Sequence, residues 1–383
     1  MCDACSFIMK EEEKPRFICC PAPEFLAEIG PYTHAQLKWL SATFTSTSHL
    51  FYAGCATPDE MNEWLNWTLH ELPEPVTITD DITAIDSNHS TVGMAYHGKL
   101  RKLQFPHLKR RVELLFEAER TIRVRVGPYT FTVTDINGSG VSDTSYKNSA
   151  PCLILRVLAI LYALIDMDGM TDEEILQHLQ ALIKLVYTSA AGDDGITRMP
   201  RVLFGVDTMT PTFKERYQAF WAEAGFSVKV QFFPEHRWRM ATYLAMRPVW
   251  GGTDYQWAPE PARRMKSMFW QIDNAMHPIA WARGVATQVL QQGRHCPVLS
   301  DVCEWFLART TGPTGPGESK PYSPWDGYIT SGVRNMRAEM EFLADYHIDP
   351  SELHMMRRIL SQTESVYVNL GFSALRRVML EES

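Results

Sequence analysis

Hydrophobic and polar positions alternate most regularly in residues 76–85, where VTITDDITAI combines β-branched residues with a period of two. Such a run is typical of a β-strand. A similar run, YTFTV at 129–133, predicts a second strand. Residues 185–188, a turn at 192–195 and the chain from Ile196 onward predict a β-hairpin.

Helical patterns occupy much of the remaining sequence. Residues 58–69 and the long apolar segment 142–165 each predict a helix. Thr171 and Glu174 have the spacing of a capping box, which opens a further helix. Beyond Trp250 the pattern is mostly helical, interrupted by the Gly- and Pro-rich segment 310–321, which predicts a surface loop. The sequence therefore predicts a mixed α and β chain with a helical C-terminal region.

The most apolar stretch, residues 152–165, is interrupted by Arg156 and is shorter than the roughly 20 residues that a membrane-spanning helix needs. It predicts a buried helix, and we expect no transmembrane segment in this chain. The first residues lack a basic segment followed by an apolar one, so the sequence does not predict secretion.

Composition indicates a globular protein of the size of an enzyme. The 383 residues include 45% hydrophobic and 21% charged residues, which excludes disorder, collagen and coiled coil. A net charge of -8 argues against a protein that wraps nucleic acid with its whole surface. The charge is uneven, however. Residues 1–75 are acidic, whereas residues 99–135 contain nine Lys and Arg but only four Asp and Glu.

The eight cysteines are scattered, which is typical of free thiols in a reducing compartment. Cys2 and Cys5 form a CxxC pair, and Cys19 with Cys20 would complete a zinc site. Because that second pair lacks the usual ligand spacing, we do not expect structural zinc.

Two groups of carboxylates carry candidate chemistry. Asp81 and Asp86 stand five positions apart at the end of the first predicted strand, and Asp193 and Asp194 lie between two glycines at the predicted hairpin turn. Adjacent carboxylates repel one another unless a cation lies between them, and Mg²⁺ prefers such oxygen ligands. Each group also has an ordinary interpretation, because Asp-Asp-Gly is a common turn and an Asp at a strand end often caps a helix.

A third element lies between these two. Ser139, Gly140, Thr144 and Asn148 fit the spacing SGxxxTxxxN. Gly140 would allow close approach of the backbone to a ligand, and Thr144 and Asn148 would share one helical face. Taken alone, the segment is better explained as a loop that ends in a helix cap.

The order D-x4-D, SGxxxTxxxN and GDD resembles motifs A, B and C of viral RNA-dependent RNA polymerases. The details are most similar to the nodavirus-like polymerases, with the tombusvirus-like ones next. Further segments resemble motif F, motif D, motif E and a downstream segment of these enzymes: residues 14–18 (KPRFI), 217–229, 243–247 (YLAMR) and 297–303 (PVLSDVC).

This resemblance implies an α+β right-hand polymerase with an antiparallel palm, partial fingers and a helical thumb. The implied division is fingers with motif F at 1–75, palm motif A at 76–98, a basic fingers insertion at 99–135, palm motifs B to E at 136–250 and the thumb at 251–383. The implied activity is RNA-dependent RNA synthesis, a nucleotidyl transfer from ribonucleoside triphosphates with two Mg²⁺ or Mn²⁺ ions.

Individual roles follow from the same resemblance. Asp81 and Asp193 would bind the metal ions, with Asp194 as a weaker ligand, and Lys229 would protonate pyrophosphate unless it is an ordinary surface lysine. The residues that would bind the nucleotide are Lys14 and Arg16 at the triphosphate, Ser139 and Gly140 in the flexible turn, and Asp86, Thr144 and Asn148 at the ribose. The residues that would contact the template or the nascent strand are Lys109, Arg110, Arg111 and Arg247, the last of which has an ordinary surface arginine as its alternative.

Two departures qualify the resemblance. Ser87 stands where the nodavirus-like motif A commonly has glycine, and Ala191 replaces a larger residue before GDD.

Motif F also begins near the first residue, so we expect either a fragment or one part of a split replicase. A second polypeptide would then supply upstream fingers, a membrane anchor or capping activity. The implied location is the host cytoplasm, including membrane-associated replication complexes reached through that partner.

Two alternatives remain at this stage. The first is a non-catalytic RNA-binding or scaffolding fragment that needs a partner to supply the missing fingers. The second is a reverse transcriptase, in which a bulky aromatic residue usually stands at the position of Asp86. A carboxylate there favours synthesis of RNA over synthesis of DNA.

Overall fold

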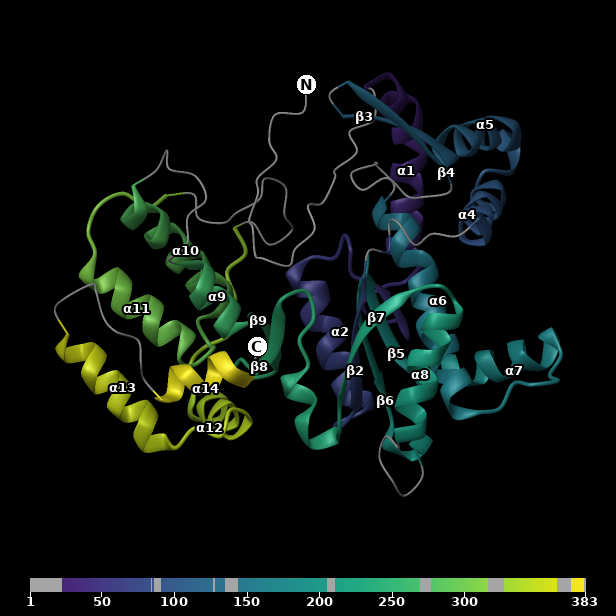
Figure 1. Ribbon diagram of the computed structural model, residues 1–383. Helices are drawn as coiled ribbons and strands as arrows, with labels where there is room; N and C mark the ends of the chain where they lie inside the picture. The colour runs from purple at the N-terminus through teal and green to yellow at the C-terminus, as the bar shows by residue number, and fades with distance from the viewer. Residues whose placement is uncertain are drawn as a thin grey trace.

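The structure is a computed structural model that describes residues 23–83, 85, 91–126, 128–134, 144–204, 211–268, 277–315, 327–363 and 373–381. It has a lobe built on a five-stranded sheet and a mostly helical C-terminal lobe beside it (Figure 1). The predicted α+β fold class is confirmed, because the described residues combine helices with largely antiparallel strands.

The main sheet has the strand order β1-β5-β6-β2-β7. β1 pairs with β5 in parallel, whereas the other neighbours are antiparallel. The predicted strand and the predicted hairpin lie at its centre, while the short β1 was not predicted. The strands are β1 (Leu50–Tyr52), β2 (Val76–Thr83), β5 (Tyr187–Ala191), β6 (Asp194–Met199) and β7 (Ser227–Phe233).

Two long helices cover one face of this sheet: α6 (Thr144–Leu164) and α8 (Pro211–Glu223) (Figure 1). Ile78 and Ile82 project from the same face of β2, and they pack in the same core as Val157 of α6. The alternation in the sequence therefore reports this buried face. The helix α7 (Asp172–Ile183) follows, and the predicted capping box of Thr171 and Glu174 is present.

By length and composition, Tyr146–Leu164 in α6 would be able to cross a membrane, but 67% of this window is buried inside the protein. Leu153 and Val157 are fully buried under the sheet. The long helix expected from the sequence is confirmed as a core helix.

The opposite face of the sheet is covered by an aromatic layer. α2 (Pro58–Glu71) stacks Trp64 on Phe51, and Tyr187 and Trp238 belong to the same buried cluster. A capping box between Thr57 and Glu60 fixes the start of this helix. The other elements on this side are η3 (Glu235–Met240), β8 (Met246–Trp250) and β9 (Tyr255–Pro259).

The basic segment forms a small unit above the main sheet in Figure 1, next to the long helix α1 (Pro23–Thr43). Its helices and strands are α4 (Thr91–Gln104), η1 (Pro106–Leu108), α5 (Lys109–Arg120), β3 (Thr121–Val126) and β4 (Tyr129–Thr134). β3 and β4 form a separate two-stranded antiparallel ribbon, so the predicted strand at 129–133 is confirmed. α1 was not predicted, because Pro31 lies inside it.

The C-terminal lobe is helical, as the sequence predicts. Its core includes Val302, Phe306, Phe342 and Leu353, which come from three different helices. The hairpin of β8 and β9 was not expected beyond Trp250. A 3₁₀ helix, η2 (Arg201–Phe204), follows β6 earlier in the chain. The helices of this lobe are α9 (Pro261–Met268), α10 (Pro278–Gly293), α11 (Leu299–Arg309), α12 (Met336–Asp345), α13 (Pro350–Gln362) and α14 (Ser373–Glu381).

Candidate active site

Three charged residues form a row across β6, β2 and β7, which are neighbours in the main sheet. Asp81 of β2 is paired with Asp194 of β6 on one side and with Lys229 of β7 on the other. Residues directly opposite in antiparallel strands project their side chains to the same face of the sheet. The fold therefore brings Asp194, Asp81 and Lys229, which are far apart in sequence, next to one another.

A two-residue loop connects β5 to β6 and places Asp193 at its tip. Gly192 has a φ of 71°, whereas Asp193 stays in the ordinary negative range, which is the pattern of a type II′ turn. Glycine at the first loop position makes this turn possible without strain. The turn is tighter than the predicted one at 192–195, because Asp194 and Gly195 already belong to β6.

Main-chain contacts fix this turn in place. The carbonyl of Asp193 accepts hydrogen bonds from the Ile82 amide at 3.3 Å and from Arg156 Nη2 at 3.0 Å. The Gly192 amide donates to Ser149 Oγ at 2.7 Å. The turn is thus attached both to β2 and to α6.

The three aspartates create a strongly acidic environment. The pKa of Asp194 is raised from 3.8 to about 6, chiefly because the carboxyl group is largely buried, and then because Asp193 and Asp81 are negatively charged. Like charges directly opposite one another destabilise a sheet. A divalent cation would relieve this repulsion, and carboxylate oxygens are the ligands that Mg²⁺ prefers.

The carboxylate oxygens of the three aspartates are therefore suitable ligands for a divalent metal ion, although they do not form a closed metal centre. Within the part of the chain that the structure describes, no three His, Cys, Asp or Glu side chains converge as a metal cluster. A metal ion at Asp81, Asp193 and Asp194 would have to draw their carboxylates together. Magnesium sites commonly keep several water and phosphate ligands, so few protein ligands suffice.

Sequence reasoning missed the structural role of Asp80, which directly precedes Asp81 in β2. Asp80 faces the helix side of the sheet, where Arg156 Nε donates to Asp80 Oδ1 at 2.7 Å and Tyr217 Oη donates to Asp80 Oδ2 at 3.0 Å. Both side chains of the ion pair are fully buried. The signal was present in the sequence: Asp80 lies in register with Ile78 and Ile82, and Arg156 interrupts an apolar helix.

The predicted nucleotide-binding residues are only partly described. Asn148 is buried in α6 and directly precedes Ser149, which contacts the turn. Thr144 is the first residue of the same helix. The other predicted residues lie outside the described residues: Lys14, Arg16, Asp86, Ser139, Gly140 and the cysteines at 2, 5, 19 and 20.

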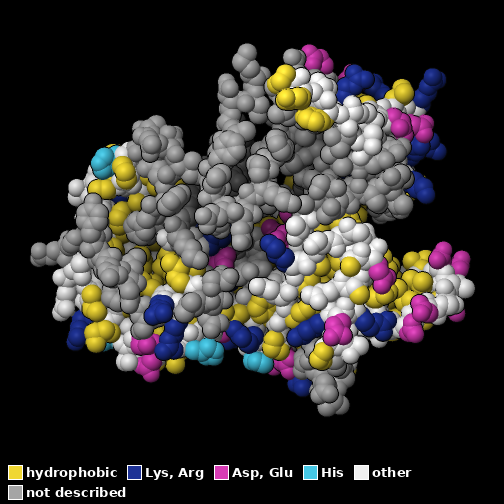
Figure 2. Space-filling model, viewed as in Figure 1, with side chains coloured by type: hydrophobic (Ala, Val, Ile, Leu, Met, Phe, Trp, Pro, Cys, Tyr) yellow, Lys and Arg dark blue, Asp and Glu magenta, His cyan; other side chains and the backbone are white. Residues whose placement is uncertain are grey.

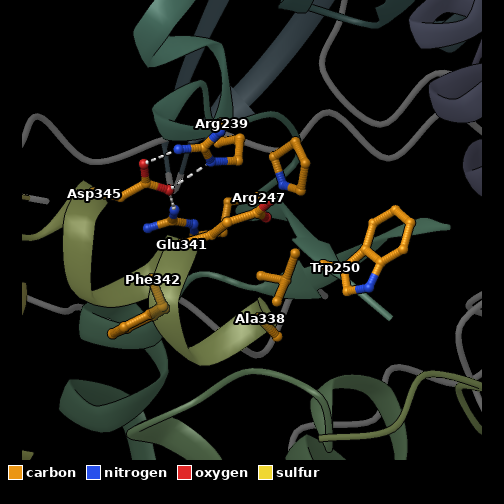
Figure 3. Close-up of a pocket in the computed structure, with 9 residues that line it drawn as sticks. Arg239, Arg247, Trp250, Ala338, Glu341, Phe342 and Asp345 are labelled. Atoms are coloured by element: carbon orange, nitrogen blue, oxygen red, sulfur yellow. Dashed lines mark hydrogen bonds and ion pairs between the residues drawn. The ribbon is translucent and has the colours of Figure 1, made fainter. Parts of the chain in front are cut away.

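Arg247 requires a correction. Its side chain is buried, and Arg247 Nη2 donates to Asp345 Oδ2 at 2.9 Å (Figure 3). The guanidinium carbon of Arg247 lies 4.6 Å from the ring centre of Tyr346. Arg239 binds the same carboxylate with two nitrogens. Arg247 therefore joins β8 to α12 instead of contacting a nascent strand. The pocket around it is lined by residues of η3, β8 and α12, and by none of the three aspartates.

The basic residues that the sequence predicts for a nucleic-acid contact lie at the start of α5, and their contact with nucleic acid stays a prediction. Lys109, Arg110 and Arg111 are exposed in the first turn of this helix. Cations are unfavourable at a helix N-terminus, so these residues are not explained by helix stability. Arg111 forms an ion pair with Glu28 of α1. Figure 2 shows Lys and Arg side chains gathered on this corner of the molecule.

Lys229 is exposed on β7, in the row with the two carboxylates. A lysine on an exposed strand is also a common means of preventing edge-to-edge association, and β7 is an edge strand of the sheet. Its position next to Asp81 is compatible with the predicted chemical role.

Comparisons with known proteins find similarity among solved structures and none among the sequences searched. No protein-family model matches the sequence, and no curated protein sequence matches it. Among solved structures the chain is similar to one described as Sicinivirus 3Dpol RNA dependent RNA polymerase, with 15% identity and a TM-score of 0.46. The similarity covers 77% of this chain and 56% of that chain. The chain thus spans a little over half the length of that viral polymerase.

Proposed function

We propose that this protein catalyses template-directed RNA synthesis from ribonucleoside triphosphates, as a viral RNA-dependent RNA polymerase. One observation carries the proposal: Asp81 and Asp194 are directly opposite each other in the sheet, and Asp193 occupies the adjoining turn. These are the carboxylates that the sequence motifs single out, and the fold brings them to one end of the central strands.

The carboxylates would bind two Mg²⁺ or Mn²⁺ ions, with Asp81 and Asp193 as the principal ligands. When bound, the ions would promote attack by the 3′-hydroxyl of the nascent strand and stabilise charge on the departing pyrophosphate. Lys229 is exposed beside Asp81 and would donate a proton to that leaving group.

Residues near the start of α6 would recognise the nucleotide. Asn148 is adjacent in sequence to Ser149, which bonds to the turn, so it lies near the proposed metal site. With Thr144 and Asp86 it would bind the ribose 2′-hydroxyl, while Ser139 and Gly140 would form the predicted flexible turn, whose backbone would approach the nucleotide. Lys14 and Arg16 would neutralise the triphosphate.

The basic unit of α4, α5 and the β3–β4 ribbon would hold RNA. Three exposed cations in one helical turn, Lys109, Arg110 and Arg111, supply the charge that phosphate binding requires. Arg247 is excluded from this role by its burial.

We also propose a viral subtype. The motif sequences favour a nodavirus-like enzyme, followed by a tombusvirus-like one. We propose that it works in the host cytoplasm, with a second polypeptide that contributes upstream fingers, a membrane anchor or capping activity. We also propose a division into fingers, palm and thumb with boundaries at residues 75, 98, 135 and 250.

A primer-extension assay with ribonucleoside triphosphates and Mg²⁺ tests the activity. Asp193→Ala should abolish extension, whereas Asp168→Ala, an exposed aspartate in the α6–α7 connector, should leave it unchanged. Wild-type activity in Asp193→Ala would refute the metal site. Removal of divalent ions with EDTA should stop extension, and Mn²⁺ should restore it.

A second candidate is an RNA-binding fragment that is inactive without a partner. It is favoured by the exposed cations at the start of α5, Lys109, Arg110 and Arg111, which can bind phosphate whether or not the protein is catalytic. It predicts that the protein binds a template but does not extend a primer until an upstream polypeptide is added. A reverse transcriptase would instead incorporate deoxynucleotides about as well as ribonucleotides.

A further inference from the structure

We propose that α6 acts as a clamp on the turn that carries Asp193, with Arg156 and Ser149 as positioning residues for the active site. This inference rests on the proposed function, and it assigns a task to two residues outside the predicted motifs. Arg156 and Ser149 would not touch the substrate. They would hold the main chain so that Asp193 and Asp194 stay in register with Asp81.

The guanidinium of Arg156 connects three elements. It projects from α6, binds Asp80 of β2 through Nε at 2.7 Å, and binds the carbonyl of Asp193 through Nη2 at 3.0 Å. The side chain is fully buried, so these contacts are shielded from water. A planar group with donors in a fixed arrangement sets both distance and angle, which a lysine ammonium cannot do.

The second contact comes from the same side of the helix. Ser149 precedes Arg156 by seven residues, or about two helical turns, so both side chains face the sheet. Ser149 Oγ accepts a hydrogen bond from the Gly192 amide at 2.7 Å. α6 therefore holds the two consecutive loop residues, Gly192 and Asp193, through their main-chain atoms.

Gly195 shows that the clamp is tightly packed. A Cβ atom at this position would lie 2.0 Å from Arg156 Nε, far inside van der Waals contact. The need for glycine here arises from the close approach of Arg156, since Gly195 is not among the glycines with positive φ. The glycine that follows the two aspartates thus makes room for the positioning residue.

Asp80 has a defined part in this arrangement. It neutralises Arg156 within the core, and Tyr217 fixes its second oxygen. Arg156 reaches Asp193 through the carbonyl oxygen and not through the carboxylate. The clamp therefore orients the turn by a main-chain contact, with the charge of the guanidinium balanced by Asp80.

The test compares Arg156→Lys and Ser149→Ala with wild type. Arg156→Lys keeps a cation beside Asp80 but cannot also hold the Asp193 carbonyl. We expect kcat for primer extension to fall about 10–100-fold, because small displacements of reacting groups have effects of this size. The Mg²⁺ concentration for half-maximal rate should rise, while KM for the nucleotide should change little. Arg216→Lys is the matched control, since Arg216 also donates to a main-chain carbonyl, that of Ile165, away from the site.

Hydrogen exchange provides a readout that requires neither metal nor activity. Amides of residues 187–199 should exchange faster in Arg156→Lys and Ser149→Ala, and at the wild-type rate in Arg216→Lys. A double-mutant cycle adds a second criterion. Gly195→Ala should reduce kcat strongly in wild type but much less in an Arg156→Met background, where the space is available.

These outcomes separate the clamp from the proposed function. If Asp193→Ala is inactive but Arg156→Lys and Ser149→Ala show wild-type kcat, Mg²⁺ requirement and exchange, the clamp is refuted and the polymerase assignment stands. If Asp193→Ala is active, the polymerase site is refuted, and the exchange data alone decide whether α6 holds the turn. Should Arg156→Lys fail to fold, Ser149→Ala gives the decision, because it removes one hydroxyl near the turn and leaves the buried ion pair intact.

Discussion

Asp80 and Asp81 are neighbours in β2, yet they face opposite sides of the sheet and have different environments. Asp80 is fully buried in an ion pair with Arg156, whereas Asp81 lies opposite Asp194 on the other face. The period of two in a strand produces this division. One carboxylate therefore belongs to the folded core, and the other is available to the candidate active site.

Substitution of the two aspartates should separate stability from activity. Asp80→Asn removes the charge that balances Arg156, so we expect the free energy of unfolding to fall by about 3–5 kcal/mol. Asp81→Asn removes a charge from a repulsive group and should leave stability equal or slightly higher, but it should abolish primer extension. Urea denaturation and the extension assay measure the two effects. Equal loss of stability in both variants would contradict the assigned faces.

A second buried arginine allows a matched comparison. Arg198 is fully buried between Trp64 and Trp238, with its guanidinium carbon 5.4 Å and 5.5 Å from the two rings. Arg198 Nη1 donates to Thr68 Oγ1 and to the Leu65 carbonyl, and the residues that the structure describes supply no carboxylate partner. Burial accordingly lowers the pKa of Arg198 to about 9.

We therefore expect opposite results from the same substitution at two sites. Arg198→Met removes a buried charge without orphaning an anion, so stability should stay within about 1 kcal/mol of wild type or increase. Arg156→Met leaves Asp80 unpaired and should cost about 3–5 kcal/mol. Chemical denaturation checks both. A larger loss in Arg198→Met than in Arg156→Met would show that the tryptophan contacts outweigh the cost of burying the charge.

The raised pKa of Asp194 predicts how the stability of the metal-free protein depends on pH. Its pKa is about 6 in the folded protein against an ordinary 3.8, so the folded state binds this proton more tightly. Between these two values the free energy of unfolding should fall as pH rises, by at most about 3 kcal/mol. Below both values, the contribution of Asp194 no longer changes.

Asp194→Asn isolates this contribution. In EDTA, the difference in stability between the variant and wild type should grow as pH rises from about 4 to about 6 and then level off. Added Mg²⁺ should reduce the difference above pH 6 by stabilising wild type alone. Parallel pH profiles for the two proteins would contradict the environment assigned to Asp194.

The turn between Tyr243 and Met246 contains two non-glycine residues with left-handed backbone. Leu244 and Ala245 have φ values of 53° and 59°, and the flanking residues form two main-chain hydrogen bonds across the turn. This is the pattern of a type I′ turn, which favours Asn-Gly. Left-handed backbone costs roughly 1–2 kcal/mol for a residue with a side chain.

Ala245→Gly should relieve part of that strain and raise the free energy of unfolding by about 0.5–1 kcal/mol. The control is Ala222→Gly in α8, an exposed helical position, where glycine should lower stability by about 1 kcal/mol. Thermal denaturation compares the two variants. Equal losses would indicate that the turn is not strained. If primer extension falls while stability rises, the strained turn contributes to activity.

The sequence predicted the elements whose periodicity is local and missed those that depend on contacts between distant segments. β2, α6 and the capping boxes follow from their own residues. β1 has three residues and exists because it pairs with β5, more than a hundred positions away. β9 pairs with β8 and was hidden by the helical pattern that surrounds it.

The candidate site shows the same distinction. Motif spacing predicted Asp81, Asp193 and Asp194, and the ladder brings Asp81 and Asp194 together. Spacing did not predict that Arg247 is buried, because its partner Asp345 lies in a helix about a hundred residues further along. Nor did it distinguish Asp80 from Asp81, since which face is buried depends on α6 and α8.

The basic turn of α5 gives the final prediction, which concerns RNA. Charge reversal at Lys109, Arg110 and Arg111 should weaken binding of single-stranded RNA and reduce the dependence of binding on salt. Each phosphate contact that is lost should lower the slope of log K against log salt concentration by about 0.7. The effect should be similar for templates of different sequence, because contacts to phosphate carry no sequence information.

The control reverses Arg358 and Arg376, exposed cations of α13 and α14 in the C-terminal lobe. Fluorescence anisotropy over a range of salt concentrations measures both. An equal fall in affinity and slope for the control and for the double reversal at Lys109 and Arg110, which changes the same number of charges, would show that RNA responds to net charge alone. A loss confined to α5 would place the RNA on the basic unit. Arg111 also pairs with Glu28, so the double reversal at Lys109 and Arg110 should retain most of the effect while leaving that ion pair intact.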